Sequence, residues 1–185
     1  VSRDWSSDVC SSDLELYFAV LLYTGLRAGD AAMLTYGNID FSQNVITTLV
    51  RKSRRVHEFP LSDHLVSLIP KSKDDNEPLF PTLYVTKTNS VGEIVADERI
   101  LHYRIDIPRK RFQMILKEAD RPKATLHSFR VTFNNLLFAE KLSIEDRQSL
   151  MAHSSSKTTT VYTHPNLELA RDYINKLPNY SSGKK

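Results

Sequence analysis

The sequence predicts an α+β fold that is mainly helical, with one small antiparallel β-sheet or hairpin. Apolar residues recur at helical spacing in several separate segments, whereas only "NVITTLV" and "RVHEFPL" are β-branched, alternating runs. The chain has 185 residues and 41% hydrophobic content, which is enough for one ordinary domain with a core. We therefore expect a single globular unit.

The N-terminal half is expected to hold two helices and the hairpin. From Glu15, the apolar spacing predicts a buried helix that stops at Gly25 in "YTGLR". A second helix is expected from Ala28 through "GDAAMLTYG", ending before "NID". The two strand-like runs are joined through the basic "RKSR", which places Lys52 near the turn of an antiparallel hairpin.

The C-terminal half is expected to be helical after a loop-rich stretch at 70 to 98. A short helix capped by Ser62 precedes this stretch, and "DERILHYRIDIPRKRFQMILKEAD" follows it with helical length, although Pro108 must kink or divide it. A buried helix over "HSFRVTFNNLLFAEK" and a short helix from Ser143 come next. The tail "NLELARDYINKLP" predicts an amphipathic helix whose apolar face holds Leu169, Tyr173, Ile174 and Leu177.

The first fourteen residues differ from the rest of the chain. "VSRDWSSDVCSSDL" repeats an S-S-D pattern and has neither helical nor strand periodicity. We interpret residues 1–14 as a non-native or artefactual leader and residues 15–185 as the folded domain. On this interpretation Trp5 and Cys10 carry no function.

Composition argues against several classes of protein. No run of eighteen apolar residues and no secretory signal is present, so we expect no membrane association and a cytoplasmic location. A single cysteine excludes a disulfide framework and a multi-cysteine metal site. The net charge of +3 decides little, but cations gather in "RKSRRVH" and "YRIDIPRKR". Clustered cations are suited to bind the phosphate backbone of a nucleic acid. The alternative is that each cluster is only a solvated surface or a hairpin tip, which has the same composition.

Four side chains are weak signals when each is taken singly. His127 and Arg130 stand three residues apart at the start of a helix, so they share a face and would reach one anion together. A structural histidine beside a surface arginine gives the same pattern. Arg27 follows a Gly-terminated helix, where a cation can simply complement the helix end. Tyr162, taken alone, is equally compatible with an ordinary half-buried tyrosine.

The order and spacing of the motifs are more informative. "TGLRAGDAAMLTYGNIDF", "RKSRRVHEFPL", "HSFR" and "LMAHSSSKTTTVYTH" together resemble the catalytic domain of the tyrosine recombinases, the phage integrase family. In that family the Arg of T-G-L-R precedes an acidic residue by three, and a hairpin Lys precedes a strand Pro by eight. An H-x-x-R motif follows, and a His then precedes the nucleophilic Tyr by nine. The matching positions here are Arg27, Asp30, Lys52, Pro60, His127, Arg130, His153 and Tyr162.

The resemblance implies metal-independent cleavage and rejoining of DNA strands through a 3′-phosphotyrosine, with no cofactor. Tyr162 is then the nucleophile, because a phenol is more acidic than an aliphatic hydroxyl and its phosphate ester can be reversed. Arg27 and Arg130 are assigned to hold the non-bridging phosphate oxygens with their planar forks. Lys52 is assigned as the general acid for the departing 5′ oxygen.

The remaining site residues have supporting roles by the same resemblance. His127 is assigned to shuttle the tyrosine proton or to donate to phosphate, and His153 to hydrogen-bond the phosphate. Asp30 is assigned to orient an arginine or a histidine, with a surface acid near a helix start as the alternative. Backbone-phosphate contacts are assigned to Arg51, Arg54 and Arg55. His164 is interpreted as structural, and no metal site is expected.

The chain also departs from the family pattern. The usual Gly before the His is Ala152, and the frequent His-Thr after H-x-x-R is Val131-Thr132, but neither position carries a catalytic side chain. The family's N-terminal core-binding domain is expected to be absent here. For the full-length protein the resemblance implies double-stranded DNA as partner, a homo-tetramer with each tail docked on a neighbouring subunit, and a nucleoid location in a bacterium or phage host.

Two alternatives to a site-specific recombinase or integrase stay open from the sequence. A type IB topoisomerase-like or telomere-resolving strand transferase uses much the same residues. A non-catalytic DNA-binding relic of a mobile element is the other alternative, although the intact set of motif residues argues against decay.

Overall fold

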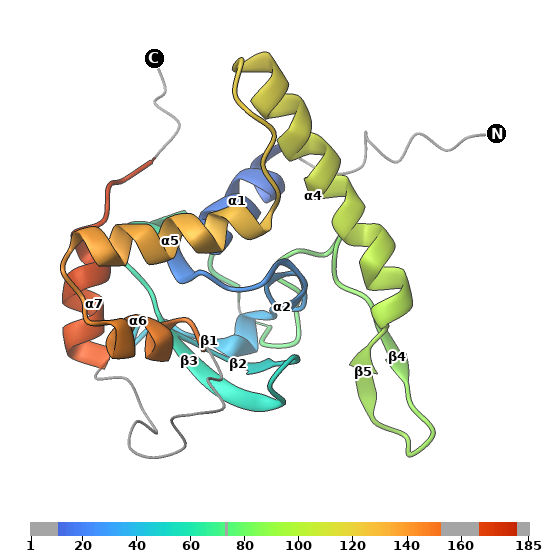
Figure 1. Cartoon of the computed structure of the whole chain (residues 1–185). Helices are drawn as coiled ribbons and strands as arrows, with labels where there is room; N and C mark the ends of the chain where they lie inside the picture. Colours follow the sequence, from blue (N-terminus) through green and yellow to red (C-terminus); the bar gives the residue numbers. More distant parts are fainter. Residues whose placement is uncertain (1–10, 73, 153–166, 181–185) are drawn as a thin grey trace.

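A computed structural model of the protein describes residues 11–72, 74–152 and 167–180. In this structure, helices α1 and α2 lie between a three-stranded sheet and helix α5 (Figure 1). These elements span α1 (Ser11–Thr24), α2 (Ala28–Ala32) and α5 (His127–Ala139). Helix α1 lies in the core, where several of its side chains, such as Tyr17 and Leu21, are fully buried. Helix α1 begins at Ser11, so the expected domain boundary at Glu15 falls inside a helix.

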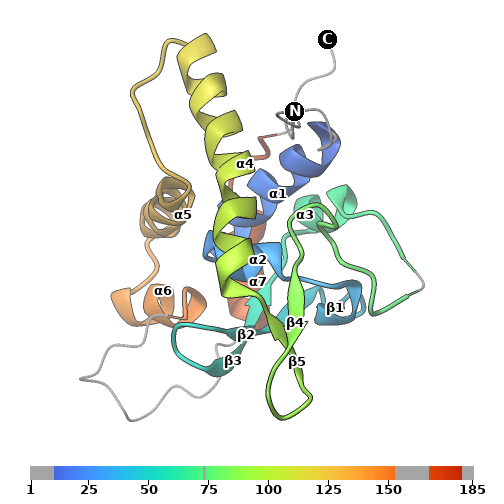
Figure 2. The same ribbon diagram turned by 90° about the vertical axis from the view of Figure 1, so that its right-hand side faces the viewer.

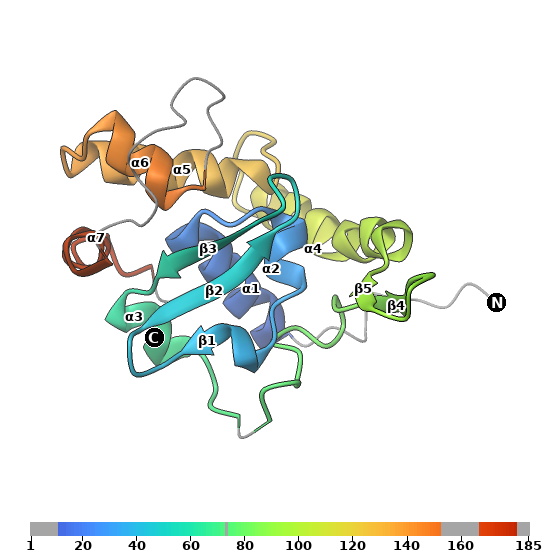
Figure 3. The same cartoon turned by 90° about the horizontal axis from the view of Figure 1, so that it is seen from below.

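The sheet contains the hairpin that the sequence predicts. Strands β1 (Ile39–Asp40), β2 (Val45–Val50) and β3 (Arg55–Pro60) are antiparallel with β2 in the middle. The β2–β3 register pairs Val50 with Arg55, so the connecting turn holds residues 51–54. This turn reaches toward α2 at the edge of the sheet (Figure 3). The mainly helical α+β fold with a small antiparallel sheet is thereby confirmed.

Helix α2 is shorter than expected. It ends at Ala32 because the chain turns to pair with a later segment: the Leu79 N–H donates to the Leu34 carbonyl over 2.9 Å. Thr35 is extended and begins a short 3₁₀ helix, η1 (Tyr36–Asn38), where Asn38 accepts from the Thr35 N–H at 2.9 Å. The predicted helix through "MLTYG" is therefore wrong, since partners far along the chain override local helix propensity.

The segment after the sheet forms a capped helix and a second hairpin. Ser62 caps α3 (Asp63–Leu68) by accepting from the Leu65 N–H over 3.1 Å, as the sequence predicts. Within the stretch expected to be loop, strands β4 (Thr86–Thr88) and β5 (Ile94–Ala96) pair as an antiparallel hairpin. Figure 2 shows this hairpin at the foot of α4.

Helix α4 (Glu98–Glu118) is one continuous helix of 21 residues, capped by Asp97. Of the two effects expected of Pro108, a kink or a division of the helix, the division is wrong. Proline removes one backbone donor, but a long helix with many other hydrogen bonds tolerates that loss. Helix α4 packs on α2, which places its first turn near the β2–β3 turn.

The last helices cover the opposite end of the sheet. Helix α6 (Ile144–Leu150) is capped by Ser143, and α7 (Leu167–Asn175) packs against β3 of its own chain. The buried face of α7 and the residues after it consists of Ala170, Ile174 and Leu177. Leu169 was expected on this face, but its side chain is 48% exposed because it lies one position off the stripe.

Across the described ranges, no helix combines the length and the apolar character that a membrane span requires.

The turn between α1 and α2 has a fixed conformation. The Thr24 hydroxyl donates to the Val20 carbonyl over 2.6 Å and accepts from the Leu26 N–H over 3.1 Å. Gly25 has φ +63°, in the left-handed region that side chains disfavour. A Cβ added at Gly25 would lie 2.5 Å from Cδ1 of Phe133 on α5. Glycine is therefore required here both by conformation and by space.

Gly25→Ala should lower the free energy of unfolding by at least about 2 kcal/mol, because left-handed strain and displacement of Phe133 add together. Urea denaturation measures this loss. Gly92→Ala is the matched control, since Gly92 has φ +86° with no atom within 4 Å of an added Cβ, and strain alone applies there. Equal losses in the two variants would contradict the close contact with Phe133.

Candidate active site

Arg27 stands at the start of α2 with its side chain 30% exposed. Its backbone is extended, at φ −71° and ψ 145°, so the residue lies just before the first helical turn. The nearest carboxylate oxygen, Oδ2 of Asp30, is 3.9 Å from Arg27 Nη1, which is too far for a hydrogen bond. With respect to the described residues, the Arg27 guanidinium therefore keeps its donors available for an exposed anion.

Arg130 lies one turn into α5 and is only 3% exposed. Its Nη1 donates to the Gly25 carbonyl, and its Nη2 donates to the Met151 carbonyl. Burying a guanidinium is costly unless its donors are satisfied, so these carbonyls fix the side chain in place. The contact joins the turn before Arg27 to the end of α6.

The charge of Arg130 is destabilised by its surroundings. Burial, with a smaller contribution from the positive charge of Arg27, lowers the pKa of Arg130 to about 10, and the Asp30 carboxylate opposes this shift. A desolvated cation near a second cation is stabilised by an anion placed close to both. The pair Arg27 and Arg130 is thus suited to bind a phosphate.

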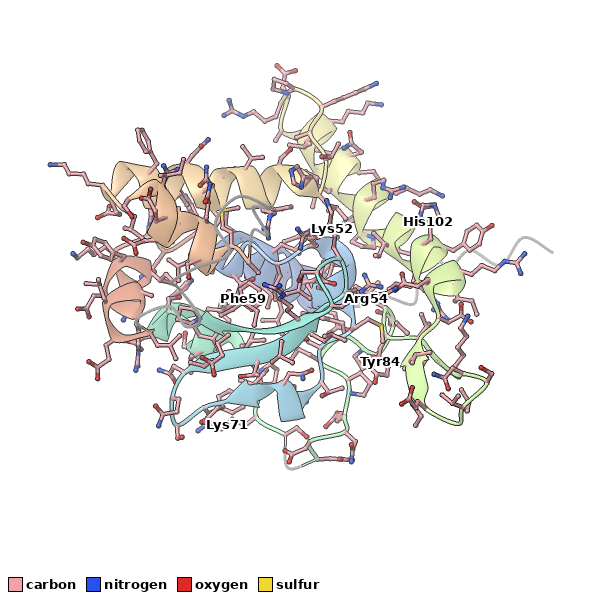
Figure 4. All side chains as sticks on the ribbon, turned by 60° about the horizontal axis from the view of Figure 1, so that its bottom comes forward. Lys52, Arg54, Phe59, Lys71, Tyr84 and His102 are labelled. Carbon is pink, nitrogen blue, oxygen red and sulfur yellow. The ribbon has the colours of Figure 1, made fainter. Side chains whose placement is uncertain are left out.

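Lys52 lies at the exposed tip of the β2–β3 hairpin (Figure 4). The turn closes on the Val50 carbonyl, which accepts from the N–H groups of Ser53 at 3.1 Å and Arg54 at 2.8 Å. Arg54 adopts φ +54° to complete the turn. Arg54 and Arg55 are exposed, so their charges are available for the backbone-phosphate contacts that we predict.

His127 is the first residue of α5 and is exposed. Its place one turn before Arg130 agrees with the predicted helix start. Leu126 occupies the N-cap position and provides no side-chain cap, so the first N–H groups of α5 point toward the same end as His127. This end of the helix favours a negative charge.

Asp30 is buried, at 3% exposure, so the alternative of a surface acid is wrong. Its Oδ1 accepts from Arg51 Nε over 3.0 Å and from the Arg51 N–H over 3.4 Å. Of the two arginines near Asp30, Arg51 is therefore the one held by hydrogen bonds, as Arg27 is 3.9 Å away. The Arg51 guanidinium also contacts Glu98 over 2.6 Å. Contact of Arg51 with DNA remains a prediction.

His153, Tyr162 and His164 lie outside the described residues. The chain leading to them can be followed to Met151, which is buried, and Ala152, which has φ +49°. Glycine adopts a left-handed backbone more easily than other residues. This explains why glycine is usual at this position in the tyrosine recombinases, which the sequence resembles. Ala152 adopts the conformation at a cost of roughly 1 kcal/mol.

His57 is a neighbour of Arg130 that the sequence prediction missed. Its ring packs edge-on against Phe59, and its Nε2 is buried with no hydrogen-bond partner in the part of the chain that the structure describes. Strand alternation puts His57 on the face of the buried Phe59, which is the signal that would have found it. Burial lowers the pKa of His57, and the positive charge of Arg130 contributes, while the backbone of Ser149 and the Glu58 carboxylate oppose the shift.

No group of three or more His, Cys, Asp or Glu side chains within the described ranges is arranged to hold a metal ion.

The sequence pattern of the phage integrase family matches residues 7–168. The chain belongs to the phage integrase family. A relative, the probable integrase/recombinase of Acholeplasma phage L2, is 25% identical over 165 residues, which cover 89% of this chain and 53% of the relative. The chain thus spans about half the length of this relative.

Solved structures share the fold of this phage integrase family member. The integrase of mycobacterium phage Brujita matches 97% of this chain and 56% of its own, with TM-score 0.65 and 15% identity. The catalytic domain of bacteriophage HP1 integrase matches 95% of this chain and 82% of its own, with TM-score 0.52 and 22% identity. The XerH site-specific recombinase bound to difH substrate matches 94% and 45%, with TM-score 0.53 and 18% identity.

The lowered pKa of His57 predicts a loss of stability in mild acid. The folded chain binds the proton less readily than the unfolded chain, in which the histidine has its ordinary value of 6.5. The stability present above pH 6.5 should therefore decline as the pH falls below it. Urea denaturation of His57→Gln should show a flatter pH dependence, whereas exposed His102→Gln should retain the slope. An unchanged slope in His57→Gln would exclude this residue as the cause.

Proposed function

We propose that this chain cleaves and rejoins DNA strands in site-specific recombination, without a metal ion, through a 3′-phosphotyrosine on Tyr162. The observation that carries the proposal is the buried Arg130 fork, which joins the Gly25 carbonyl to the Met151 carbonyl. It connects the Arg27 turn to the segment that leads to Tyr162. The match to the phage integrase family over residues 7–168 includes every predicted site residue.

The proposed step moves one proton at each end of the reacting phosphate. The Tyr162 oxygen bonds to phosphorus, and its proton passes to His127. The bond from phosphorus to the 5′ oxygen breaks, and Lys52 gives that oxygen a proton to form the free 5′ hydroxyl. The reverse step, with a 5′ hydroxyl from another strand, releases Tyr162 and rejoins the DNA.

Arg27 and Arg130 are proposed to stabilise the charge on the non-bridging oxygens, with His153 as a further donor. In other enzymes, removal of one such donor costs roughly 3–4 kcal/mol of transition-state stabilisation. Arg130 has five N–H donors, and its two carbonyl contacts leave others for phosphate. Arg27, which is more exposed, is free to adjust to the bound strand.

The proposed partner is double-stranded DNA, in line with the solved structure of the XerH site-specific recombinase, which is bound to difH substrate in a pre-cleavage complex. Arg54 and Arg55 beside Lys52 are proposed to contact backbone phosphates. In the full-length protein we infer a homo-tetramer on DNA, acting at the nucleoid of a bacterium or phage host. In the single chain α7 packs on its own body, where Arg171 contacts Asp63 over 2.8 Å. Docking on a neighbouring subunit would require this contact to open.

The family match supports recombination over the topoisomerase-like, telomere-resolving and non-catalytic alternatives. The topoisomerase-like and telomere-resolving enzymes use much the same catalytic side chains as a recombinase. The identity of the site residues therefore does not by itself distinguish these activities. The named relatives are integrases and recombinases.

Tyr162→Phe should abolish covalent capture of DNA, because phenylalanine lacks the attacking oxygen. A library of nicked duplexes of randomised sequence, in which the released strand diffuses away, traps the phosphotyrosine as an adduct that survives denaturing electrophoresis. The reaction contains a chelator, since no metal ion is required.

The matched control is Tyr180→Phe, an exposed tyrosine that should leave capture unchanged. Retention of the adduct by Tyr162→Phe would refute the assignment of the nucleophile. No adduct with the unaltered chain, or an adduct that requires a divalent metal, would refute the proposed function.

A further inference from the structure

Arg51 is held at the base of the turn that carries Lys52. Its backbone N–H and its Nε both donate to Oδ1 of Asp30, at 3.4 and 3.0 Å. Its Nη1 donates to Oε1 of Glu98, at the start of α4, over 2.6 Å. One side chain therefore ties the hairpin to α2 and to α4.

Gly29 provides the space for this guanidinium. A Cβ added at Gly29 would lie 1.9 Å from Nη2 and 3.1 Å from Cζ of Arg51. Glycine within a helix is otherwise unfavourable by roughly 1 kcal/mol relative to alanine. Its presence in the first turn of α2 is explained by the approach of Arg51.

The two carboxylates do not contribute equally. The Asp30 side chain is 2% exposed, whereas the Glu98 side chain is 68% exposed. An exposed ion pair contributes little, and a buried charge left without its partner is strongly unfavourable. The contact with Asp30 therefore dominates, and Glu98 refines the position of the same guanidinium.

We propose that Arg51 is a positioning residue for Lys52: held by Asp30 and seated over Gly29, it sets where the hairpin presents the general acid. The inference rests on the proposed function, in which Lys52 protonates the departing 5′ oxygen. It replaces direct phosphate binding as the main role of Arg51. The Asp30 carboxylate is shared by two arginines, because its Oδ2 also lies 3.9 Å from Nη1 of Arg27.

The constraint matters because Lys52 itself is exposed at the turn. Proton transfer requires the donor within hydrogen-bond reach of the leaving oxygen, and a misplacement of 1 Å costs roughly a factor of 10² in rate. The residue directly before Lys52 is fixed through both its backbone and its side chain. The freedom of Lys52 is thereby confined to its own side chain.

Amide hydrogen exchange tests the structural part without any DNA. Arg51→Lys retains the charge but loses the planar fork, so exchange of the Ser53 and Arg54 N–H groups should become about tenfold faster. Gly29→Ala should act in the same way by displacing Arg51, with α1 and α5 unchanged. Glu98→Gln should change exchange by no more than about fivefold. Glu118→Gln, an exposed change at the far end of α4, is the charge-matched control and should have no effect.

Cleavage kinetics test the link to Lys52. The substrate is a duplex whose sequence is one that the unaltered chain captures from the library. On this duplex, Arg51→Lys should lower the cleavage rate about 10²-fold, with unchanged DNA affinity and unchanged salt dependence of binding. A duplex with sulfur in place of the bridging 5′ oxygen releases a thiolate, which needs no proton, while the tyrosine proton still passes to His127. Arg51→Lys and Gly29→Ala should cleave this duplex at the rate of the unaltered chain.

The possible outcomes separate this inference from the proposed function. Unchanged hydrogen exchange in Arg51→Lys overturns the positioning role, whether or not DNA is cleaved. A loss of affinity with a reduced salt slope, or an equal defect on the oxygen and sulfur duplexes, also overturns it and favours a phosphate contact or a general disturbance. If the unaltered chain cleaves neither duplex, the proposed function fails, and faster exchange at the turn then supports only the contact with Asp30.

Discussion

The buried guanidinium of Arg130 is the contact on which the rest of the site depends. It donates to carbonyls from the turn before Arg27 and from the end of α6, which are far apart in the sequence. A cation placed in the interior requires such hydrogen-bond acceptors, so movement of either segment would leave a buried N–H donor of Arg130 unsatisfied. The same side chain remains cationic beside Arg27, which makes an anion favourable there. Fold and chemistry are therefore coupled at one residue.

A second buried charge, Asp30, extends this arrangement to the hairpin. Its carboxylate holds Arg51 by hydrogen bonds and attracts Arg27 from a longer distance. The buried groups thus form a fixed frame, in which Arg130 is itself proposed to contact the phosphate, and the other groups proposed to meet DNA, such as Lys52 and His127, lie exposed around it. This division is physically reasonable, since preorganised charge favours catalysis while the reacting side chains must reach the substrate.

Much of the fold could be predicted from the sequence because local signals sufficed. The helix before Gly25, the hairpin at residues 45–60 and the Ser62 cap each depend on neighbouring residues. Helix α2 was predicted too long and the β4–β5 hairpin was missed, since both depend on pairing with distant or weakly patterned segments.

The sequence supplies candidate site residues, whose roles stay predictions, but it supplies little about their contacts. Motif spacing selects Arg27, Lys52 and Arg130, but it does not indicate that Arg130 is buried on two carbonyls. The roles of His57 and Arg51 are set by tertiary packing against α6 and α2, for which one sequence carries only faint signals. Strand alternation and the glycine at position 29 were those signals.

A crystal structure of the Tyr162→Phe chain tests the central claim most directly. The chain is bound to an uncut duplex whose sequence is one that the unaltered chain captures covalently. We predict a phosphate within about 3.2 Å of donors from both Arg27 and Arg130. The Arg130 side chain should still donate to the Gly25 and Met151 carbonyls. A phosphate bound elsewhere, or an Arg130 side chain that has left those carbonyls to reach DNA, would contradict the account.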